Sequence, residues 1–229
     1  MQYVSNIACW KGGKNLARNK YPEITENRIL ELSMKLFIEK GYEQTTLQDV
    51  ADAMGMTRGA IYHHFKNKEQ MVDAVTTYMF HKAVPFETIK EDTSLTALEK
   101  LRKIVLCSVS SEDQVNTFLA LSKTFLDNPK LVAAYLNSVK ENAEGIFLEF
   151  IKEGMSDGSV QAENPKIVAE LLSVLMEIWL CPFIFMENRE DFRIKLRYAA
   201  NILNSVGLPI IDDELLTVFE KLETIFPER

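Results

Sequence analysis

The stretch that decides the fold is TTLQDVADAMGMTRGAIYHHFKNKE, residues 45–69. Its first half repeats apolar side chains at the i, i+3, i+4 and i+7 spacing of an amphipathic helix, at Leu47, Val50, Ala51 and Met54. Thr45 or Thr46 can cap the start of this helix, with Gln48 or Asp49 placed three residues further on. Gly55 can end it, because glycine accepts the left-handed conformation of a helix stop.

A second short helix follows the glycine. Thr57 can cap it, and Ile61 and Phe65 lie four residues apart on the side that should face inward. Its outer side then carries Arg58, Gly59, Ala60, Tyr62 and His63. Two helices joined by a glycine turn, the second with a polar outer face, predict a helix-turn-helix whose second helix enters the DNA major groove.

These residues and their neighbours resemble the TetR/AcrR family of bacterial transcriptional regulators. ILELSMKLFIEKGY at 29–42 is similar to the family's first helix, and KNKEQM at 66–71 to the entry into its fourth. The resemblance covers about residues 23–83, with the helix-turn-helix at about 46–65, and no comparable signature marks residues 84–229. It implies an all-α protein: a three-helix DNA-binding domain at 23–83, then a helical ligand-sensing and dimerisation domain at 84–229.

Several residues of the motif are candidates for DNA contact. Thr46 offers a hydroxyl and free backbone N–H groups to a phosphate. Arg58 is the candidate for base recognition, since a guanidinium can donate twice to guanine. Gly59 allows close backbone approach, and Ala60 can touch a thymine methyl. Gln48 suits either a base contact or capping, two interpretations that the sequence leaves equal.

The resemblance adds further backbone contacts. Tyr62 and Lys68 match positions at which family members commonly hold the DNA backbone. His63 and His64 are expected to hold the DNA backbone in the same way, with the alternative that one of them packs against the turn. Thr57, at the start of the second helix, is a further candidate contact. The implied partner is a palindromic double-stranded DNA operator, bound by a homodimer.

The charge is distributed unevenly along the chain. The net charge is −7, but residues 1–70 hold ten Lys/Arg against eight Asp/Glu, whereas residues 71–229 hold sixteen against twenty-five. A mildly basic N-terminal part joined to an acidic remainder directs the N-terminal part towards phosphates. Residues 1–22 form a basic leader, most simply a disordered one, with a DNA-binding arm as the alternative.

Other function classes lack support in the sequence. It contains no HExxH, GxSxG, GxGxxG or P-loop motif, so we expect no enzyme, no cofactor and no metal site. Cys9, Cys107 and Cys181 share no metal or disulfide spacing, which fits a reducing cytoplasm. A regulator activated by ligand or by redox change at Cys107 and Cys181 is the main alternative, and a helical adaptor without DNA specificity is a weaker one.

The rest of the chain is expected to be helical. The expected helices are 68–85, 94–109, 111–126, 129–154, 165–181, 191–206 and 213–226, and Asn128-Pro129 and Asn164-Pro165 are matched helix starts. The most apolar run, residues 171–186, is too short to span a bilayer, so we expect no membrane association.

The family resemblance also implies a small, largely hydrophobic effector that releases the repressor from DNA. Aromatic side chains and one acid are the candidate contacts: Tyr78, Phe86, Phe118, Phe125, Tyr135, Phe147, Phe150, Glu177, Trp179 and Phe183. Most aromatics at helical spacing are plain core, which is the alternative for each. Glu177 lies inside the apolar run and needs a partner; an Arg or Lys of another helix is favoured over a cationic ligand.

The last long helices are apolar on more than one face. Because the family dimerises through such helices, the candidate intersubunit contacts are Leu171, Leu175, Ile178, Ile194, Leu196, Ile202 and Leu203. Burial within the protomer is the alternative for each of them.

Overall fold

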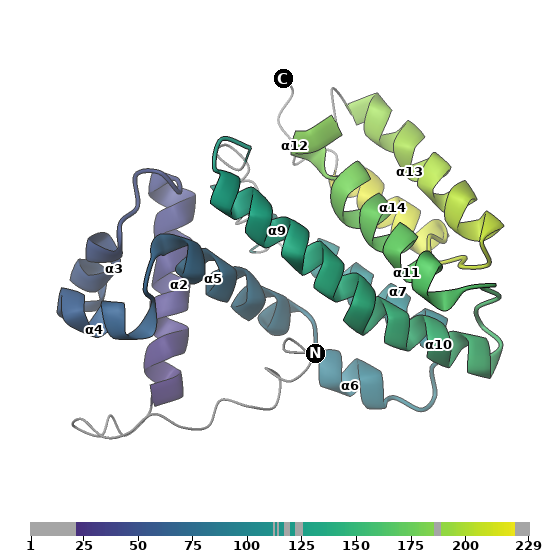
Figure 1. Ribbon diagram of the computed structural model, residues 1–229, viewed down its shortest axis with the longest axis horizontal. Helices are drawn as coiled ribbons and strands as arrows, with labels where there is room; N and C mark the ends of the chain where they lie inside the picture. Colours follow the sequence, from purple (N-terminus) through teal and green to yellow (C-terminus); the bar gives the residue numbers. More distant parts are fainter. Residues whose placement is uncertain are drawn as a thin grey trace. The chain divides into compact units, whose positions relative to one another are not determined.

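The computed structural model describes residues 22–111, 113, 115–116, 120–121, 126–185 and 189–222. All regular structure in these ranges is helical, which confirms the all-α class (Figure 1). Within the same ranges, none of the helices combines the length and apolarity that a membrane span requires. The chain divides into an N-terminal unit, residues 22–83 with the described part of 112–134, and a C-terminal unit, residues 84–111 and 135–222.

The N-terminal unit is built on the helix α2. Its helices are α2 (Pro22–Lys40), α3 (Leu47–Met54), α4 (Arg58–His64) and α5 (Lys68–Ala83). α2 packs against α3 and α5, and α3 packs against α4. Ile29, Phe37, Val50, Ile61 and Val75 are fully buried between these helices and form its core. One apolar cluster therefore fixes the two short helices of the motif on the two longer ones.

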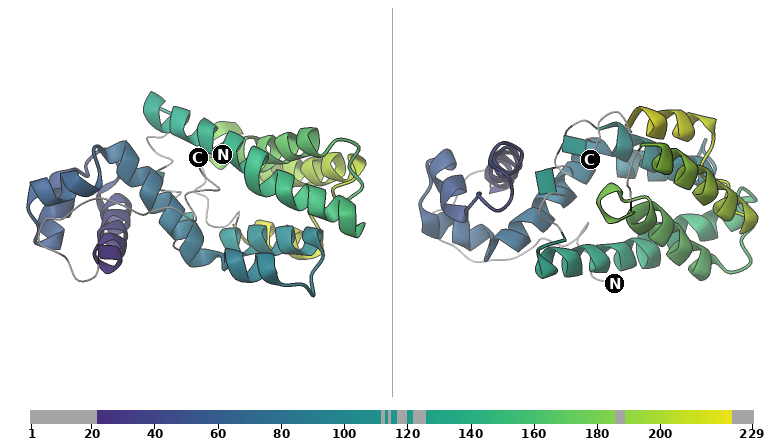
Figure 2. Two further views of the ribbon diagram at one scale, coloured as in Figure 1. Left: turned by 60° about the horizontal axis from the view of Figure 1, so that its bottom comes forward. Right: turned by 90° about the horizontal axis from the view of Figure 1, so that it is seen from above.

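The C-terminal unit contains the remaining helices, two of which are π-helical. They are α6 (Phe86–Glu91), α7 (Ala97–Ser110), η1 (Ala143–Phe147), α10 (Leu148–Asp157), α11 (Pro165–Ser173), η2 (Val174–Trp179), α12 (Pro182–Phe185), α13 (Arg189–Ser205) and α14 (Asp213–Leu222). Helix α9 (Pro129–Asn142) begins in the N-terminal unit and runs into η1 and α10 without a break (Figure 2). α10 packs against α7 and α11, and α14 packs against α7.

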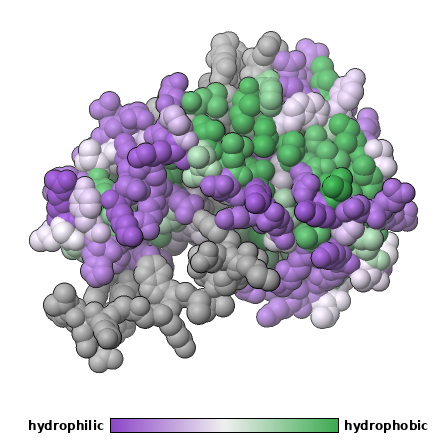
Figure 3. Space-filling view, viewed as in Figure 1, coloured by the Kyte–Doolittle hydropathy of each residue, from purple (hydrophilic) through white to green (hydrophobic). Residues whose placement is uncertain are grey.

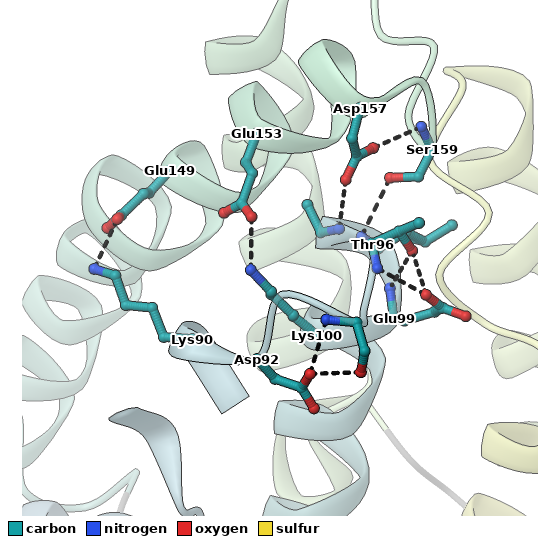
Figure 4. Close-up of polar contacts among 12 residues, drawn as sticks. Lys90, Asp92, Thr96, Glu99, Lys100, Glu149, Glu153, Asp157 and Ser159 are labelled. Carbon is teal, nitrogen blue, oxygen red and sulfur yellow. Dashed lines mark hydrogen bonds and ion pairs between the residues drawn. The ribbon is translucent and has the colours of Figure 1, made fainter. Parts of the chain in front are cut away.

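Polar contacts hold the start of α7 against the end of α10 (Figure 4). Thr96 and Glu99 form a capping box, while the Asp157 carboxylate accepts the Ala97 N–H at 2.7 Å. Buried Lys100 pairs with Glu153 of α10 at 2.7 Å. The N-terminal N–H groups of α7 are therefore satisfied partly by residues about sixty positions away, an arrangement that local sequence patterns do not reveal.

Several helix boundaries differ from those expected. The helix that was expected to end at Gly154 continues to Asp157, with Gly158 as its C-cap. Gly154 instead lies inside α10, where a Cβ would meet Val160 Cγ2 at 2.5 Å, so a glycine allows the following chain to pack closely. α6 was not expected at all, and α7 begins at Ala97 rather than near Ser94.

Candidate nucleic-acid interface

The N-terminus of α3 is fixed by a reciprocal capping box. The Thr46 hydroxyl accepts the Asp49 N–H at 3.1 Å, and the Asp49 carboxylate accepts the Thr46 N–H at 2.8 Å. Lys40 pairs with the same carboxylate at 2.8 Å. Lys40 and the Thr46 hydrogen bonds lower the pKa of Asp49 well below its usual range. The Thr46/Asp49 pair is thus the cap, and Thr45 is buried, donating its hydroxyl to the Gly41 carbonyl at 2.8 Å.

A glycine stop and a second cap set the angle between α3 and α4. Gly55 adopts φ +65°, a left-handed conformation, and its N–H returns to the Asp52 carbonyl at 3.1 Å. The Thr57 hydroxyl accepts the Ala60 N–H at 3.3 Å and so starts α4. Ile61 is fully buried and Phe65 is 3% exposed, as the sequence predicted. With that side anchored, the opposite side of α4 is directed outwards.

The outward side of α4 gathers most of the predicted contact residues. Arg58, Gly59 and His63 are exposed, Tyr62 is 41% exposed, and Ala60 is half-buried. The Arg58 guanidinium donates to the Tyr62 hydroxyl at 3.1 Å and lies 5.0 Å from the centre of its ring. This pairing, one turn apart, holds the guanidinium along the helix surface. A Cβ at Gly59 would meet nothing within 4 Å, so protein packing does not require a glycine there.

Three other predicted contact residues have partners within the protein. Gln48 donates its side-chain N–H to Asp52 at 2.7 Å, so it does not cap α3. His64 is half-buried and its ring lies 6.2 Å from that of Phe65, the packing alternative. The Lys68 ammonium donates to the carbonyls of Tyr42 and Glu43 at 2.8 and 3.3 Å and lies 4.0 Å from the centre of the Tyr42 ring.

Lys68 therefore has a structural role that the sequence did not reveal. It links the start of α5 to the chain that follows α2, across 26 positions of sequence. The Tyr42 ring beneath it is buried, and burial raises the pKa of its hydroxyl to about 12. The ammonium thus holds the chain that leads into α3 in place.

The predicted effector residues fall into separate groups. Tyr78 lies on α5, and its hydroxyl donates to Glu31 of α2 at 2.8 Å, so it links two helices of the N-terminal unit. Phe86 and Phe150 are buried, with ring centres 6.2 Å apart, and belong to the core of the C-terminal unit. Phe118, Phe125 and the side chain of Phe183 lie outside the described residues.

Tyr135 and Glu177 do come together. The Tyr135 hydroxyl donates to the Glu177 carbonyl, and Phe147 and Trp179 in the same unit are half-buried. The Glu177 carboxylate accepts from Asn142 at 2.9 Å and lies 3.0 Å from the Ser173 hydroxyl. The prediction of an Arg or Lys partner was wrong, because both partners of this carboxylate in the described chain, Asn142 and Ser173, are neutral.

Comparison with known proteins identifies the DNA-binding region of the chain. Residues 29–75 match the family described as bacterial regulatory proteins, tetR family. The HTH-type transcriptional repressor KstR2 of Mycolicibacterium smegmatis is 28% identical over 150 residues, which cover 62% of this chain and 70% of that protein. The uncharacterized HTH-type transcriptional regulator YvkB of Bacillus subtilis is 26% identical over 188 residues, covering 80% and 94%. The chain carries a TetR-family DNA-binding domain.

The structural comparison extends this likeness to the fold. Salmonella enterica GusR aligns with a TM-score of 0.59 at 17% identity, covering 84% of this chain and 99% of GusR. The relatives named as repressors and regulators support a DNA-binding transcriptional regulator and not an enzyme, and the family match assigns residues 29–75 to a TetR-type DNA-binding domain.

The predicted dimer residues divide by burial. Leu175, Leu196 and Leu203 are 6%, 1% and 0% exposed, so they belong to the protomer core, which is the alternative that the sequence left open. Ile194 is exposed, and the three others, Leu171, Ile178 and Ile202, are half-buried. The sequence did not single out Ile167, Val174 and Tyr198, which are 56%, 47% and 61% exposed on the same two helical stretches.

Proposed function

We propose that this regulator is a repressor that binds a palindromic operator as a homodimer and is released from it by a small effector. The outward face of α4 carries the proposal. Arg58 and Tyr62 form an exposed pair there, beside a glycine that the packing of the protein does not need. The helix-turn-helix principle places such a face in the major groove.

In the proposed complex, contacts are divided by chemistry. Arg58 recognises a guanine, Gly59 lets the backbone approach the bases and Ala60 touches a thymine methyl. Tyr62, His63, His64, Thr46 and Thr57 hold phosphates: the two threonines cap the starts of α3 and α4, and the other three side chains lie in the last turn of α4. Gln48 stays a candidate for a base contact once it leaves Asp52. Lys68 stays a phosphate contact that also holds the chain at Tyr42.

An exposed apolar stripe supports the proposed homodimer. Along α11 and η2, Ile167, Leu171, Val174 and Ile178 recur at helical spacing, each exposed or half-buried. On α13, Ile194, Tyr198 and Ile202 recur in the same way. Figure 3 shows apolar side chains gathered on one face of the C-terminal unit, while the N-terminal unit is mainly polar there. Two copies joined through these helices would form a four-helix contact.

Release by an effector follows from the geometry of operator binding. Two recognition helices must sit in successive major grooves, about 34–36 Å apart, so a small change in their spacing weakens cooperative binding. We assign the DNA-binding domain to residues 23–83 and effector binding and dimerisation to 84–229. Residues 1–22 are proposed as a leader, and the regulator is expected in the cytoplasm.

Selection of bound sequences from a random DNA pool, at two salt concentrations, tests the proposal. We expect an enriched palindrome whose binding weakens steeply as salt rises, because phosphate contacts release counterions. Light scattering at micromolar concentration should give a dimer, and Val174→Asp with Ile167→Asp should give a monomer. Failure to enrich any sequence, or a monomeric wild-type protein, would contradict it.

A further inference from the structure

Glu177 of η2 is the centre of a polar cluster inside the most apolar stretch of the chain. Its carboxylate bonds to Asn142 of α9 at 2.9 Å and approaches Ser173 of α11 at 3.0 Å. Its own main-chain carbonyl accepts the Tyr135 hydroxyl. Both the main chain and the side chain of Glu177 are therefore joined to α9 by hydrogen bonds.

The π-helical register explains why the Tyr135 contact is needed. In η2 the Leu180 N–H bonds to the Leu175 carbonyl, five residues back, at 2.9 Å. By the same register the Glu177 carbonyl would need the N–H of residue 182, but Pro182 has none. The Cys181 N–H goes to Ile178 at 3.3 Å instead. The Tyr135 hydroxyl supplies the missing donor.

The hydroxyl of Ser173 indicates which form of Glu177 the cluster holds. Its Oγ lies 3.1 Å from the Val139 carbonyl and 3.0 Å from Glu177 Oε1, and a hydroxyl has one proton to donate. If Glu177 is protonated, its own O–H donates to Ser173, and Ser173 donates to Val139. Both contacts are then hydrogen bonds, whereas an ionised Glu177 leaves one without a proton. Burial acts in the same direction, because it raises the pKa of Glu177 to about 7.

Neutral groups surround this acid. Tyr135, whose hydroxyl bonds to the Glu177 carbonyl, itself interacts with Cys181, and burial raises the pKa of Tyr135 far above its ordinary value, so Tyr135 stays neutral. No Lys, Arg or His pairs with Glu177 in the described part of the chain. The side chain is nevertheless only half-buried, as is that of Tyr135, which supplies an aromatic ring of the kind that suits a cation.

We propose that Glu177 is the polar anchor of the effector site and that the effector is an organic cation with an apolar body. This inference rests on the proposed function, since it supplies the effector's chemical class. Binding exchanges one cation for one proton: the Glu177 acid loses its proton to solvent, and the ionised carboxylate pairs with the bound cation. The site is neutral before and after, so no unpaired charge is left in the apolar surroundings.

The site lies apart from the proposed dimer stripe. Ser173 and Glu177, one turn apart, bond to residues of α9, whereas Val174 is 47% exposed on another side of the same helix. When Glu177 ionises, it can no longer donate to Ser173, so the Ser173 hydroxyl that bonds α11 to the Val139 carbonyl of α9 must rearrange. An effector could in this way change the packing of α9 without touching the subunit contact.

The test uses two probes of similar shape and different charge: tetraphenylphosphonium, a permanent cation, and triphenylphosphine oxide, which is neutral. Calorimetry on the full-length protein in two buffers of different ionisation enthalpy counts the protons released. Below the pKa of Glu177 we expect release of about one proton and a cation affinity that rises roughly tenfold per pH unit, levelling off above it. The neutral probe should show neither effect.

Glu177→Gln provides the matched variant, because an amide can donate to Ser173 as the neutral acid does. It should lower cation affinity at pH 8 at least about thirtyfold, abolish the proton release that wild type shows at pH 6, and leave the neutral probe unaffected. Glu144→Gln removes an exposed carboxylate from η1 and should behave as wild type. The proton count on the wild-type protein requires no variant, so the inference remains testable if Glu177→Gln unfolds.

Three outcomes would overturn the inference: cation binding without proton release at pH 6, cation binding that survives Glu177→Gln, or no cation binding at millimolar probe at pH 8. Operator selection separates this inference from the proposed function. Glu177→Gln should enrich the same palindrome as wild type. A chain that binds the cation with proton release but enriches no DNA sequence would contradict the proposed function alone.

Discussion

Polar groups fix the helix-turn-helix chiefly through local caps, whereas the C-terminal unit adds long-range contacts to its local caps. In the N-terminal unit the caps are local: Thr46 with Asp49, Thr57 with Ala60 and Asn67 with Gln70 are each three residues apart. In the C-terminal unit polar contacts join distant segments, such as Asp157 with the Ala97 N–H and Arg102 with the Ile210 carbonyl, 60 and 108 positions apart.

This difference matches the roles that we propose for the two units. Local caps fix the two short helices and leave the outer side of α4 free to contact DNA. Long-range contacts instead make the packing of one helix depend on the state of another, which is the property a sensing unit requires. Glu177 is the clearest example, because in our proposal its protonation state sets how the Ser173 hydroxyl joins α11 to α9.

The largest expected effect concerns two glycines, one from each unit, with the same unusual backbone. Gly207 has φ +80° and Gly55 has φ +65°. A Cβ at Gly207 would lie 2.2 Å from the Gln161 carbonyl oxygen, whereas at Gly55 it would meet nothing within 4 Å. Gly207→Ala should therefore lower the free energy of unfolding by about 3 kcal/mol or more. Gly55→Ala should lower the free energy of unfolding by about 1 kcal/mol, from backbone strain alone. Urea denaturation measures both, and equal losses would mean that Gly207 is not a close-packed junction.

The same division explains what the sequence could predict. Capping, the glycine stop and the inward Ile61 and Phe65 involve neighbours three or four positions apart, so residues 45–69 were enough to predict them. The role of Lys68 was missed because its partners, Tyr42 and Glu43, are about 25 positions away.

In the C-terminal unit the sequence drew attention to Glu177 but predicted the wrong partner. Asn142 and Ser173 lie on helix faces that carry no distinctive pattern, and only the packing of α9 beside α11 brings them to the acid. The π-helical segments were equally hidden, since one extra residue per turn changes which side chains share a face. Two of the aromatic candidates, Phe86 and Phe150, are core, which is the alternative that the sequence left open.

Arg58→Ala should have the next largest effect, and it acts on DNA binding alone. The side chain is exposed and bonded only to Tyr62 among the described residues, so thermal stability should stay near wild type. Operator binding should weaken by about 1–3 kcal/mol, and the preference at one base position should relax. Selection from a random pool with the variant measures this. An unchanged consensus would assign specificity to another residue.

Lys68 and Lys66 separate structural from electrostatic roles within the N-terminal unit. Lys68→Ala removes charged hydrogen bonds to the Tyr42 and Glu43 carbonyls, and we expect a loss of about 1.5 kcal/mol in unfolding free energy. It should also weaken binding to all DNA sequences alike and flatten the salt dependence. Lys66 is exposed and its ammonium has no described partner, so Lys66→Ala should leave stability unchanged. If both variants are equally stable, Lys68 does not anchor this chain segment.

Asp49→Asn tests the α3 cap through its pH dependence. The pKa of Asp49 lies below its usual 3.8 in the folded protein, chiefly because of Lys40 and Thr46. This carboxylate therefore contributes stability above the unfolded pKa, and the contribution is lost as pH falls towards the folded pKa. Its side chain is 27% exposed, so solvent screening limits the contribution to about 1 kcal/mol. Between about pH 6 and pH 3, the melting temperature of wild type should fall further than that of Asp49→Asn. Parallel curves would show that Lys40 and Thr46 add nothing.

The smallest expected change in stability is also the most informative about the interface. Gly59 is helical and exposed, and an added methyl would touch nothing within 4 Å, so Gly59→Ala should stabilise the fold by up to about 1 kcal/mol. If α4 lies against bases in the major groove, the same methyl must occupy space that DNA needs, and operator binding should weaken while melting temperature rises. Exposed Ala53 of α3 supplies a control, because Ala53→Gly should lower stability without changing the operator sequence that is selected. A Gly59→Ala protein that binds its operator as tightly as wild type would mean that the backbone of α4 stays further from the bases than we propose.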